Sequence, residues 1–427
     1  MRRGTGKCAG PVTSCARVRQ RSPLLPIFLI VLVDVLGFTI VIPLLAFYAE
    51  RFHASPLVAT TLVSVYAVCS LISTPIIGRL SDRYGRRPLL LVSQAGTFAG
   101  FLMLAFSTSL WMVFAGRILD GITAGNLSIA QAYISDHTKP ENRAKAFGVI
   151  GIAFGIGFAF GPGLGGEVAR YGMHVPFVLA ASLSALSMIC TYTLLPRTKP
   201  PQQAEPSAAP LPAGRRPGAF DFATYAEYFR RPGLGGIYLQ FFLFSFAFSC
   251  FTSGFALFAE RRFDWTAHEI GRLFTYTGVL GIIMQGGLIG RLVARFGEVS
   301  LAIAGFFAAS LGYLLLGFAQ TLAVLVVAAT FSAFGNGVLR PVITSRLTQS
   351  VGRHEQGVAL GISGSLSSMA MTLAPPTGGA LIDHGWLIAW AMVPATFAAF
   401  GLVVSVVQRR RTAPAGTAAP VAVSSSE

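Results

Sequence analysis

The chain has 427 residues, of which 53% are hydrophobic and only 12% are charged, and its mean hydropathy is +0.64. This composition excludes an ordinary globular protein with a charged surface. The net charge of +16 comes from basic residues that cluster at the ends of apolar runs. Because basic residues in such places set the orientation of membrane helices, the charge does not indicate nucleic-acid binding.

Apolar runs of about 20 residues, long enough to cross a membrane, recur along the sequence. Six are predicted in the first half and six in the second. The sequence therefore predicts an all-α integral membrane protein with twelve transmembrane helices. The predicted spans are residues 24–48, 57–78, 88–107, 110–134, 145–168, 174–195, 235–258, 269–291, 299–319, 321–345, 356–380 and 386–407.

The runs divide the chain into five parts. These are a cytoplasmic N-terminal segment at 1–22, a six-helix half at 23–196, a cytoplasmic linker at 197–233, a second six-helix half at 234–408 and a disordered cytoplasmic tail at 409–427. The linker is rich in Pro, Ala and Gln, as flexible linkers are, and it contains a predicted short surface helix at 225–229. The chain starts with a polar, basic segment, so no cleavable signal peptide is predicted.

Lysine and arginine are unevenly divided between the two sets of loops. The loops predicted to lie inside carry basic residues at 79–87, 139–145, 291–295, 346–353 and 409–411. By contrast, the predicted outer loop at 107–109 has no charge, and that at 383–384 has no basic residue. Since basic loops remain in the cytoplasm, both termini are predicted to be cytoplasmic.

A charged hinge occurs once in each half, between the second and third helices. The first copy is GRLSDRYGRRP at 78–88, and the second is GRLVARFGE at 290–298. A shift of 212 residues (290 minus 78) superposes the glycines, the leucine, two arginines and the aromatic residue. The chain is therefore a duplication, and two homologous halves are typical of transporters whose site lies between the repeats.

The first copy of this hinge resembles the signature of the major facilitator superfamily, in its loop between helices 2 and 3. The resemblance implies the fold of that superfamily and a latch that joins the halves on the cytoplasmic side when the cavity opens outward. The second copy has Ala294 in place of Asp82, so one latch acid is predicted. Its partner is expected near 356–360, at the N-terminal end of helix 11, where free N–H groups favour an anion. The implied latch residues are Gly78, Asp82, Arg83, Gly85, Arg86 and Arg87.

A basic loop that only sets the topology is the alternative to the latch. It accounts for the arginines but not for Asp82 or the glycines.

The fifth predicted helix carries a second motif, which resembles that of drug/proton antiporters rather than that of symporters. Glycines at i, i+4 and i+8 predict a groove in which another helix approaches closely, and the proline breaks the backbone ladder. Small residues at this spacing also occur in ordinary membrane packing, which is the alternative for the glycines alone. The motif consists of Gly148, Gly157, Gly161, Pro162, Gly165 and Gly166.

Few ionisable residues lie deep in the apolar runs, and each is a functional candidate because a charge in the membrane interior is costly. Asp34 lies roughly 15 Å into helix 1, at 1.5 Å per residue. Burial favours the neutral form of a carboxylate, so Asp34 is the first candidate for proton coupling. Arg117 and Asp120 lie on one face of helix 4. A direct role of Asp120 in coupling and an ion pair with Arg117 that only satisfies itself are the alternatives.

Polar residues near the middle of other spans are candidates for substrate binding. The uncharged ones would equally form interhelical hydrogen bonds. The phenylalanines of helix 7, at 241–251, would suit an aromatic ligand, but a position facing lipid is the simpler prediction for most of them. The binding candidates are Asn126, Gln131, Gln240, Gln285, Asn336 and Arg340.

Over most of residues 24–405 the chain resembles the tetracycline/proton antiporter group. That group carries an acidic residue in the middle of helix 3, where this chain has Gly100, and it does not usually show charges at the positions of Asp120 and Arg340. Arg117 matches the superfamily's motif in helix 4 and would modulate protonation. The stretches that carry the resemblance are 32–43, 81–88, 116–123, 260–265 and 290–298.

These patterns predict a proton-coupled antiporter of the bacterial inner membrane, which exports a hydrophobic drug, with tetracycline first, by alternating access. The expected partners are the drug, protons and the lipid bilayer, with no cofactor, metal or nucleic acid, and the chain is expected to be a monomer. A multidrug or metabolite exporter of the same superfamily and a non-transporting receptor are the alternatives. The sequence lacks the phosphate-binding loop of an ATP-driven pump and a catalytic constellation around its six histidines, so no enzyme is predicted.

Overall fold

The computed structural model describes residues 24–138, 143–195, 222–231, 233–352 and 355–412, and the regular structure in these ranges is helical. The all-α prediction is confirmed, as is the short helix predicted at 225–229, which is α8 (Phe222–Arg230). Before α8 lie α1 (Leu24–Glu50), α2 (Pro56–Tyr84), α3 (Arg86–Ala105), α4 (Leu110–Ile122), α5 (Asn126–His137), α6 (Arg143–Val168) and α7 (Val175–Leu194). After it lie α9 (Leu234–Phe263), α10 (Ala267–Ile283), α11 (Ile289–Phe296), α12 (Glu298–Phe318), α13 (Leu322–Gln349), α14 (Gln356–Asp383) and α15 (Leu387–Thr412).

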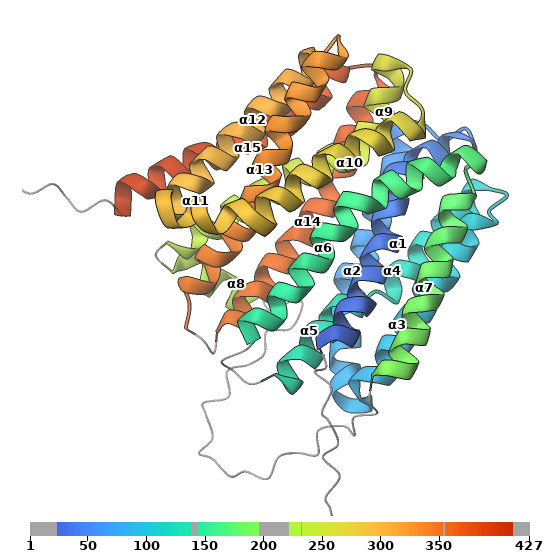
Figure 1. Cartoon of the computed structure of the whole chain (residues 1–427), viewed down its shortest axis with the longest axis horizontal. Helices are drawn as coiled ribbons and strands as arrows, with labels where there is room; N and C mark the ends of the chain where they lie inside the picture. Colours follow the sequence, from blue (N-terminus) through green and yellow to red (C-terminus); the bar gives the residue numbers. More distant parts are fainter. Residues whose placement is uncertain (1–23, 139–142, 196–221, 232, 353–354, 413–427) are drawn as a thin grey trace, which may run out of the picture.

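The helices correspond to the twelve predicted spans, with one span broken. Among the described residues, eleven helical segments are long and apolar enough to cross a membrane. The remaining predicted span, 110–134, is divided into α4 and α5 at residues 123–125. Helices α10 and α11 are joined by a π-helical turn at Met284–Leu288 and form a single span. Figure 1 shows the two halves as blue-to-green and yellow-to-red groups of helices.

The two copies of the charged hinge fold alike, as a duplication requires. In each copy, the helix ends at a glycine with a positive φ angle, Gly85 at 96° and Gly297 at 74°. The two ψ angles, 152° and 158°, also agree. A side chain at either position would be strained, because L-residues rarely adopt this conformation. Both hinges lie at the same end of the bundle, which we call the basic end; the end where α1 meets α2 and α9 meets α10 is the opposite end.

The apolar core is continuous at the opposite end and divided at the basic end. One cluster joins first-half residues near the opposite end, such as Leu45 and Phe177, to residues along α9. Near the basic end, a cluster that includes Ile30 and Ile134 is confined to the first half. Another cluster, around Val338, is confined to the second half. The halves therefore pack together at the opposite end and separate toward the basic end.

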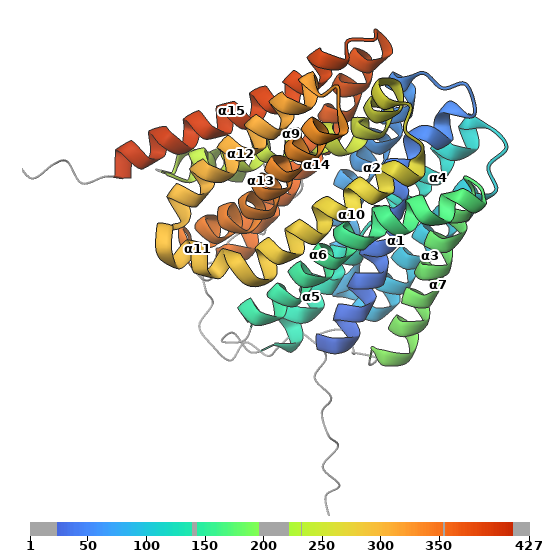
Figure 2. The same cartoon turned by 45° about the horizontal axis from the view of Figure 1, so that its top comes forward.

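Glycines on facing helices show how closely the halves approach at the opposite end. A Cβ atom at Gly166 of α6 would lie 2.6 Å from the carbonyl oxygen of Ala267 in α10. One at Gly379 of α14 would lie 2.8 Å from the carbonyl oxygen of Pro56 in α2. Neither distance leaves room for a side chain, so these helix backbones are in direct contact. In Figures 1 and 2, α6 and α10 run side by side on this part of the molecule.

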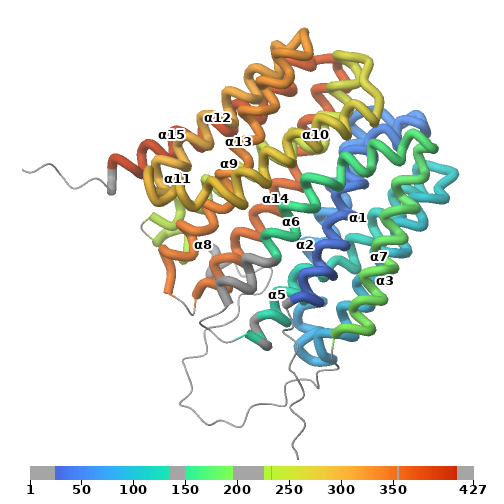
Figure 3. The backbone as a smooth tube through the Cα atoms, viewed as in Figure 1, coloured from blue at the N-terminus to red at the C-terminus, as the bar shows by residue number. Residues whose placement is uncertain are grey.

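The same helix faces are uncovered toward the basic end. Gly155 precedes Gly166 by 11 residues, about three turns, and Gly361 precedes Gly379 by 18 residues, about five turns, so each pair shares one face of its helix. Among the described residues, no neighbouring atom would come within 4 Å of a Cβ at Gly155 or Gly361. We call the region between the two halves at the basic end the interhalf gap. The backbone tube in Figure 3 shows α6 and α10 parting toward α5 and α11.

Polar side-chain contacts add to the packing at the opposite end. Arg261 of α9 lies 3.2 Å from Glu50 of α1, and the His268 ring of α10 lies 3.1 Å from Glu167 of α6. Each pair joins one half to the other. Since these side chains are partly exposed, each contributes modestly to stability.

Helix α9 is more enclosed than the sequence predicts. Phe241, Phe244, Phe246 and Phe251 are at most 9% exposed, so the prediction that most phenylalanines of this helix face lipid is wrong. The reason is that α9 packs against α13, α14 and α15 of its own half and against α1 of the other. A helix with neighbours on every side has little surface left for lipid.

The glycine contact between the halves predicts a matched pair of variants on α6. Gly166→Ala should lower stability by about 1–3 kcal/mol, because its methyl group would overlap the backbone of α10. Gly155→Ala should leave stability unchanged or raise it, because its methyl group would enter the interhalf gap and alanine favours a helix. The midpoint of thermal unfolding in detergent, followed by tryptophan fluorescence, measures both effects. Equal shifts for the two variants would contradict the separation of the halves at the basic end.

Candidate functional site

The break between α4 and α5 places polar groups in the middle of the first half. Backbone groups freed inside a membrane protein need partners from neighbouring helices. Here the Ser73 hydroxyl of α2 donates to the carbonyl oxygens of Gly121 and Ala124, at 2.7 and 3.3 Å, and the Thr74 hydroxyl donates to Ala124 at 3.2 Å. The prediction of a single helix over 110–134 is wrong at this break. Its signal is the pair of glycines in GITAG at 121–125.

Asp34 of α1 faces three polar residues from three different helices. Its carboxyl group lies within hydrogen-bonding reach of Gln94 on α3, Asn126 on α5 and Ser187 on α7. Gln94 in turn donates from Nε2 to the Ser187 hydroxyl at 2.7 Å. Gln94 and Ser187 are fully buried, whereas Asp34 and Asn126 are partly exposed. The predicted candidates Asp34 and Asn126 thus share a site, whereas Gln94 and Ser187 were not among the predicted residues.

Three oxygen atoms of this site lack a hydrogen-bond donor. Among the described residues, Asp34 Oδ1, Gln94 Oε1 and Asn126 Oδ1 are buried atoms without a hydrogen-bond partner. A buried polar atom without a partner is costly. A proton on Asp34 would supply one donor that the Gln94 or Asn126 oxygen could accept.

Arg117 and Asp120 form an ion pair buried inside the first half. The Arg117 Nη2 group donates to Asp120 Oδ2, and the two residues are 2% and 3% exposed. The guanidinium of Arg117 also lies over the ring of Tyr66 in α2, 4.9 Å from its centroid. Tyr66 interacts electrostatically with both Arg117 and Asp34, and therefore links the ion pair to the Asp34 site.

Gly100 of α3 makes room for this ion pair. A Cβ atom at this position would lie 2.9 Å from the carbonyl oxygen of Gly116 and 3.0 Å from the Cβ of Asp120. The absence of a side chain at Gly100 therefore lets α4 and the Asp120 side chain lie directly against α3.

The remaining binding candidates are dispersed. Gln240 is engaged between helices, donating to Gln408 at 2.9 Å and accepting from Arg346 at 2.9 Å. Asn336 pairs with the Tyr313 hydroxyl at 3.1 Å. Gln240 and Asn336 therefore form interhelical hydrogen bonds, which was the alternative to substrate binding. Gln131 and Gln285 are exposed.

Arg340 of α13 lies apart from this polar network. Its guanidinium lies over the ring of Phe154 in α6, 5.2 Å from the ring centroid, and its side chain is exposed. The contact therefore crosses from the second half to the first.

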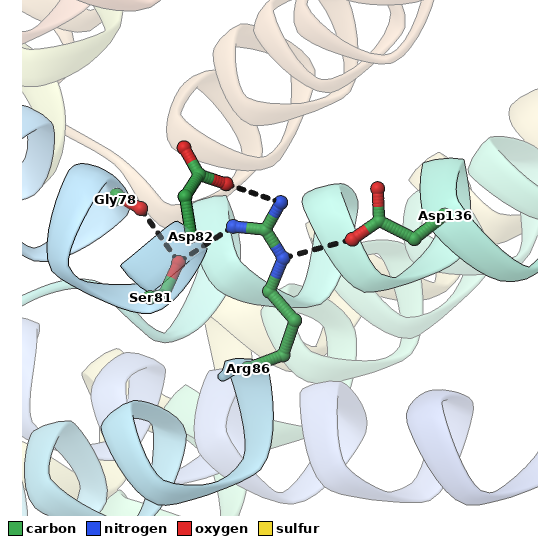
Figure 4. Close-up of polar contacts among 5 residues, drawn as sticks. All are labelled: Gly78, Ser81, Asp82, Arg86 and Asp136. Carbon is green, nitrogen blue, oxygen red and sulfur yellow. Dashed lines mark hydrogen bonds and ion pairs between the residues drawn. The ribbon is translucent and has the colours of Figure 1, made fainter. Parts of the chain in front are cut away.

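At the basic end, Arg86 connects the residues of the charged hinge (Figure 4). It lies 2.5 Å from Asp82 and 2.9 Å from Asp136 of α5, and it donates to the Ser81 hydroxyl at 2.6 Å. All four residues belong to the first half. The predicted contact between Asp82 and the start of α14 therefore stays a prediction for a state in which the basic end is closed.

The other hinge residues have separate roles. Arg87 donates to the Tyr192 carbonyl of α7 and lies over its ring, which anchors the start of α3. Arg83 is exposed, and no neighbouring atom among the described residues would meet a Cβ at Gly78.

The small residues of α6 do form the predicted groove, and α1 lies in it. Cβ atoms at Gly157 and Gly161 would overlap Val35 and Thr39, and one at Gly165 would lie 2.9 Å from the Ile40 carbonyl oxygen. The Thr39 hydroxyl donates to the Gly157 carbonyl at 2.9 Å. The other side of α6 contacts α10 through Pro162 and Gly166. Gly148 lies near the start of the same helix.

Comparison with known proteins identifies the family to which this fold belongs. The sequence profile of the Major Facilitator Superfamily matches residues 27–289 and 237–424. The chain belongs to the major facilitator superfamily. It is 32% identical, over 352 residues, to the class H tetracycline resistance protein of Pasteurella multocida, covering 82% of this chain and 86% of the relative. It is 26% identical, over 387 residues, to multidrug resistance protein 2 of Bacillus subtilis (strain 168), covering 88% and 93%.

A solved structure agrees with this assignment at the level of the fold. The crystal structure of the human organic anion transporter MFSD10 (TETRAN) superposes with a TM-score of 0.70 and 23% identity, covering 90% of this chain and 100% of that one. The predicted major facilitator fold is confirmed. The chain is a multi-pass membrane transporter whose sequence relatives include drug-resistance proteins.

The buried ion pair of this transporter predicts strong coupling between two substitutions. Arg117→Gln leaves the Asp120 carboxylate buried without its partner and should cost about 3–5 kcal/mol. Adding Asp120→Asn removes that unpaired charge, so the double variant should be more stable than Arg117→Gln alone. Midpoints of thermal unfolding for the wild type, both single variants and the double variant measure the coupling. Additive losses would show that the two side chains do not act as a pair.

Proposed function

We propose that this chain exports a hydrophobic drug in exchange for protons, that tetracycline is the first substrate to test, and that Asp34 carries the proton. The observation that supports this proposal is the Asp34 site. A carboxyl group in the apolar interior, with Gln94 and Asn126 presenting acceptors that lack donors, is suited to take up and release a proton.

The ion pair next to Asp34 would modulate this step. Tyr66 interacts electrostatically with both Arg117 and Asp34, so a rearrangement of Arg117 and Asp120 would change the field at the proton site. In this proposal Asp34 is the coupling group, Arg117 tunes it, and Asp120 holds Arg117 in place.

The basic end is proposed to be cytoplasmic, since basic loops remain inside the cell. The interhalf gap then opens to the cytoplasm, which is the state that receives a drug for export. The proposed cycle closes this end by bringing Gly155 and Gly361 against the other half, with Asp82 docked at the start of α14. The bacterial inner membrane is the proposed location, and the monomer is the proposed working unit.

A different drug is the second candidate substrate. The replacement of a helix-3 acid by Gly100, together with the charges of Asp120 and Arg340, favours a multidrug or metabolite exporter over a strict tetracycline exporter.

Transport into everted membrane vesicles tests the proposal. With a pH gradient imposed, wild-type vesicles should accumulate tetracycline, followed by its fluorescence, and a protonophore should abolish the accumulation. Asp34→Asn should reduce it to the level of vesicles without the protein, because an amide cannot exchange a proton. Asp383→Asn is the control, since Asp383 is an exposed carboxylate at the opposite end and should transport as the wild type does.

Other outcomes of this transport assay would change the substrate, exclude Asp34 or overturn the proposal. Proton release on adding other lipophilic drugs, without tetracycline uptake, would keep antiport and replace the substrate. Full activity of Asp34→Asn would exclude Asp34 as the coupling group. Absence of proton-linked transport for every compound would overturn the proposal.

A further inference from the structure

Arg340 occupies a place where a cation is costly. It lies nine residues before the end of α13 at Gln349, roughly 14 Å into the span at 1.5 Å per residue. By the same count Phe154 lies roughly 17 Å from the start of α6, and Asp34 roughly 15 Å from the start of α1. The three residues are therefore at similar depth in the apolar interior. An arginine at such a depth is retained for a function more often than for stability.

The charge of Arg340 is not neutralised by the protein. Among the described residues, no carboxylate lies within ion-pair distance of its guanidinium, which lies over the ring of Phe154. The other deep arginine of the membrane interior, Arg117, has Asp120 as its partner. Arg346, two turns further along α13, donates to Gln240 and Gln408. Arg340 therefore differs from both, and its guanidinium keeps its charge at any physiological pH.

A row of aromatic rings begins directly beneath this guanidinium. Phe154 stacks on Phe158, with ring centroids 6.4 Å apart, and Phe158 meets Phe248 of α9 at 5.9 Å in an edge-on contact. Phe248 stacks on Phe244 at 6.0 Å. Phe154, Phe158 and Phe248 are partly exposed. The row crosses from the first half to the second and offers ring faces to a planar apolar molecule.

We propose that Arg340 and this row of phenylalanines recognise an amphiphilic aromatic anion in the interhalf gap. The acidic group of the ligand binds the guanidinium, which has donors to spare, and the aromatic body lies on Phe154, Phe158 and Phe248. A cationic ligand of the same shape is disfavoured, because the charge of Arg340 repels it. The inference rests on the proposed export function for the direction of transport, but the binding preference follows from Arg340 alone.

Two dyes with the same xanthene ring system and opposite charge test this preference. Fluorescein is anionic at neutral pH, and the methyl ester of rhodamine is cationic. Fluorescence anisotropy of each dye, titrated with the purified full-length protein in detergent, should show tighter binding of fluorescein by about tenfold or more. The comparison uses the wild type, so it does not depend on whether a variant folds. Equal affinities, or a preference for the cation, would overturn the inference.

Substitution of Arg340 then tests whether this residue causes the preference for the anionic dye. Arg340→Gln should weaken fluorescein binding by about tenfold or more and leave the rhodamine ester unchanged or more tightly bound. Arg340→Lys should retain much of the preference, because it keeps the charge. Arg410→Gln is the matched control, since it removes a cation from an exposed position at the end of α15. Unchanged dye preference in a folded Arg340→Gln variant would show that the arginine only joins the two halves through Phe154.

Failure of this inference is distinguishable from failure of the proposed function. Anion-selective binding without proton-linked transport would overturn the export proposal and support the recognition site. Proton-linked transport of tetracycline with no charge preference among the dyes would support the export proposal and overturn the recognition site.

Discussion

Direct backbone contact between helices of the two halves is the constraint on which this structure depends. At the opposite end, α6 meets α10 and α2 meets α14 through glycines that leave no space for a methyl group. In a lipid environment the hydrophobic effect does little to join helices, so such close packing is a main source of their association. Because this packing is confined to one end, the halves part toward the other. Asp34 and Arg340 lie at similar depth in the two halves, and neither residue is fully buried.

The cost of charge in the membrane interior explains how the polar residues are arranged. Where the protein neutralises a charge itself, as with Arg117 and Asp120, the pair is almost completely buried. Where it does not, as with Asp34 and Arg340, the side chain is at least partly exposed. This division distinguishes charges that are paired inside the protein from those that are not. It favours the alternative of a self-satisfied ion pair for Asp120.

Much of the fold could be predicted from sequence because its signals are strong and local. Apolar runs gave the spans, and the repeated hinge gave the two halves, with Gly85 and Gly297 in matching conformations. The surroundings of Asp34 could not be predicted, because Gln94 and Ser187 come from distant helices and show no spacing in common with it. The break before Asn126 was missed because its glycines lie in an otherwise continuous apolar run. The burial of the α9 phenylalanines was also missed, since composition does not distinguish a helix surrounded by protein from one that faces lipid.

The duplication is symmetric in its backbone but not in its charges. The positions 212 residues after Asp34, Arg117 and Asp120 are occupied by Phe246, Ala329 and Ser332. Conversely, the position 212 residues before Arg340 is Ser128. The proposed proton site thus belongs to one half, and Arg340 belongs to the other. When the halves rock, groups within one half keep their distances while the separation between Asp34 and Arg340 changes. A ligand held by Arg340 and Phe154 would therefore be bound by both halves at once, and its affinity would depend on how far apart they are. Such a difference in affinity between states is what allows binding of a ligand to shift the equilibrium between the two orientations.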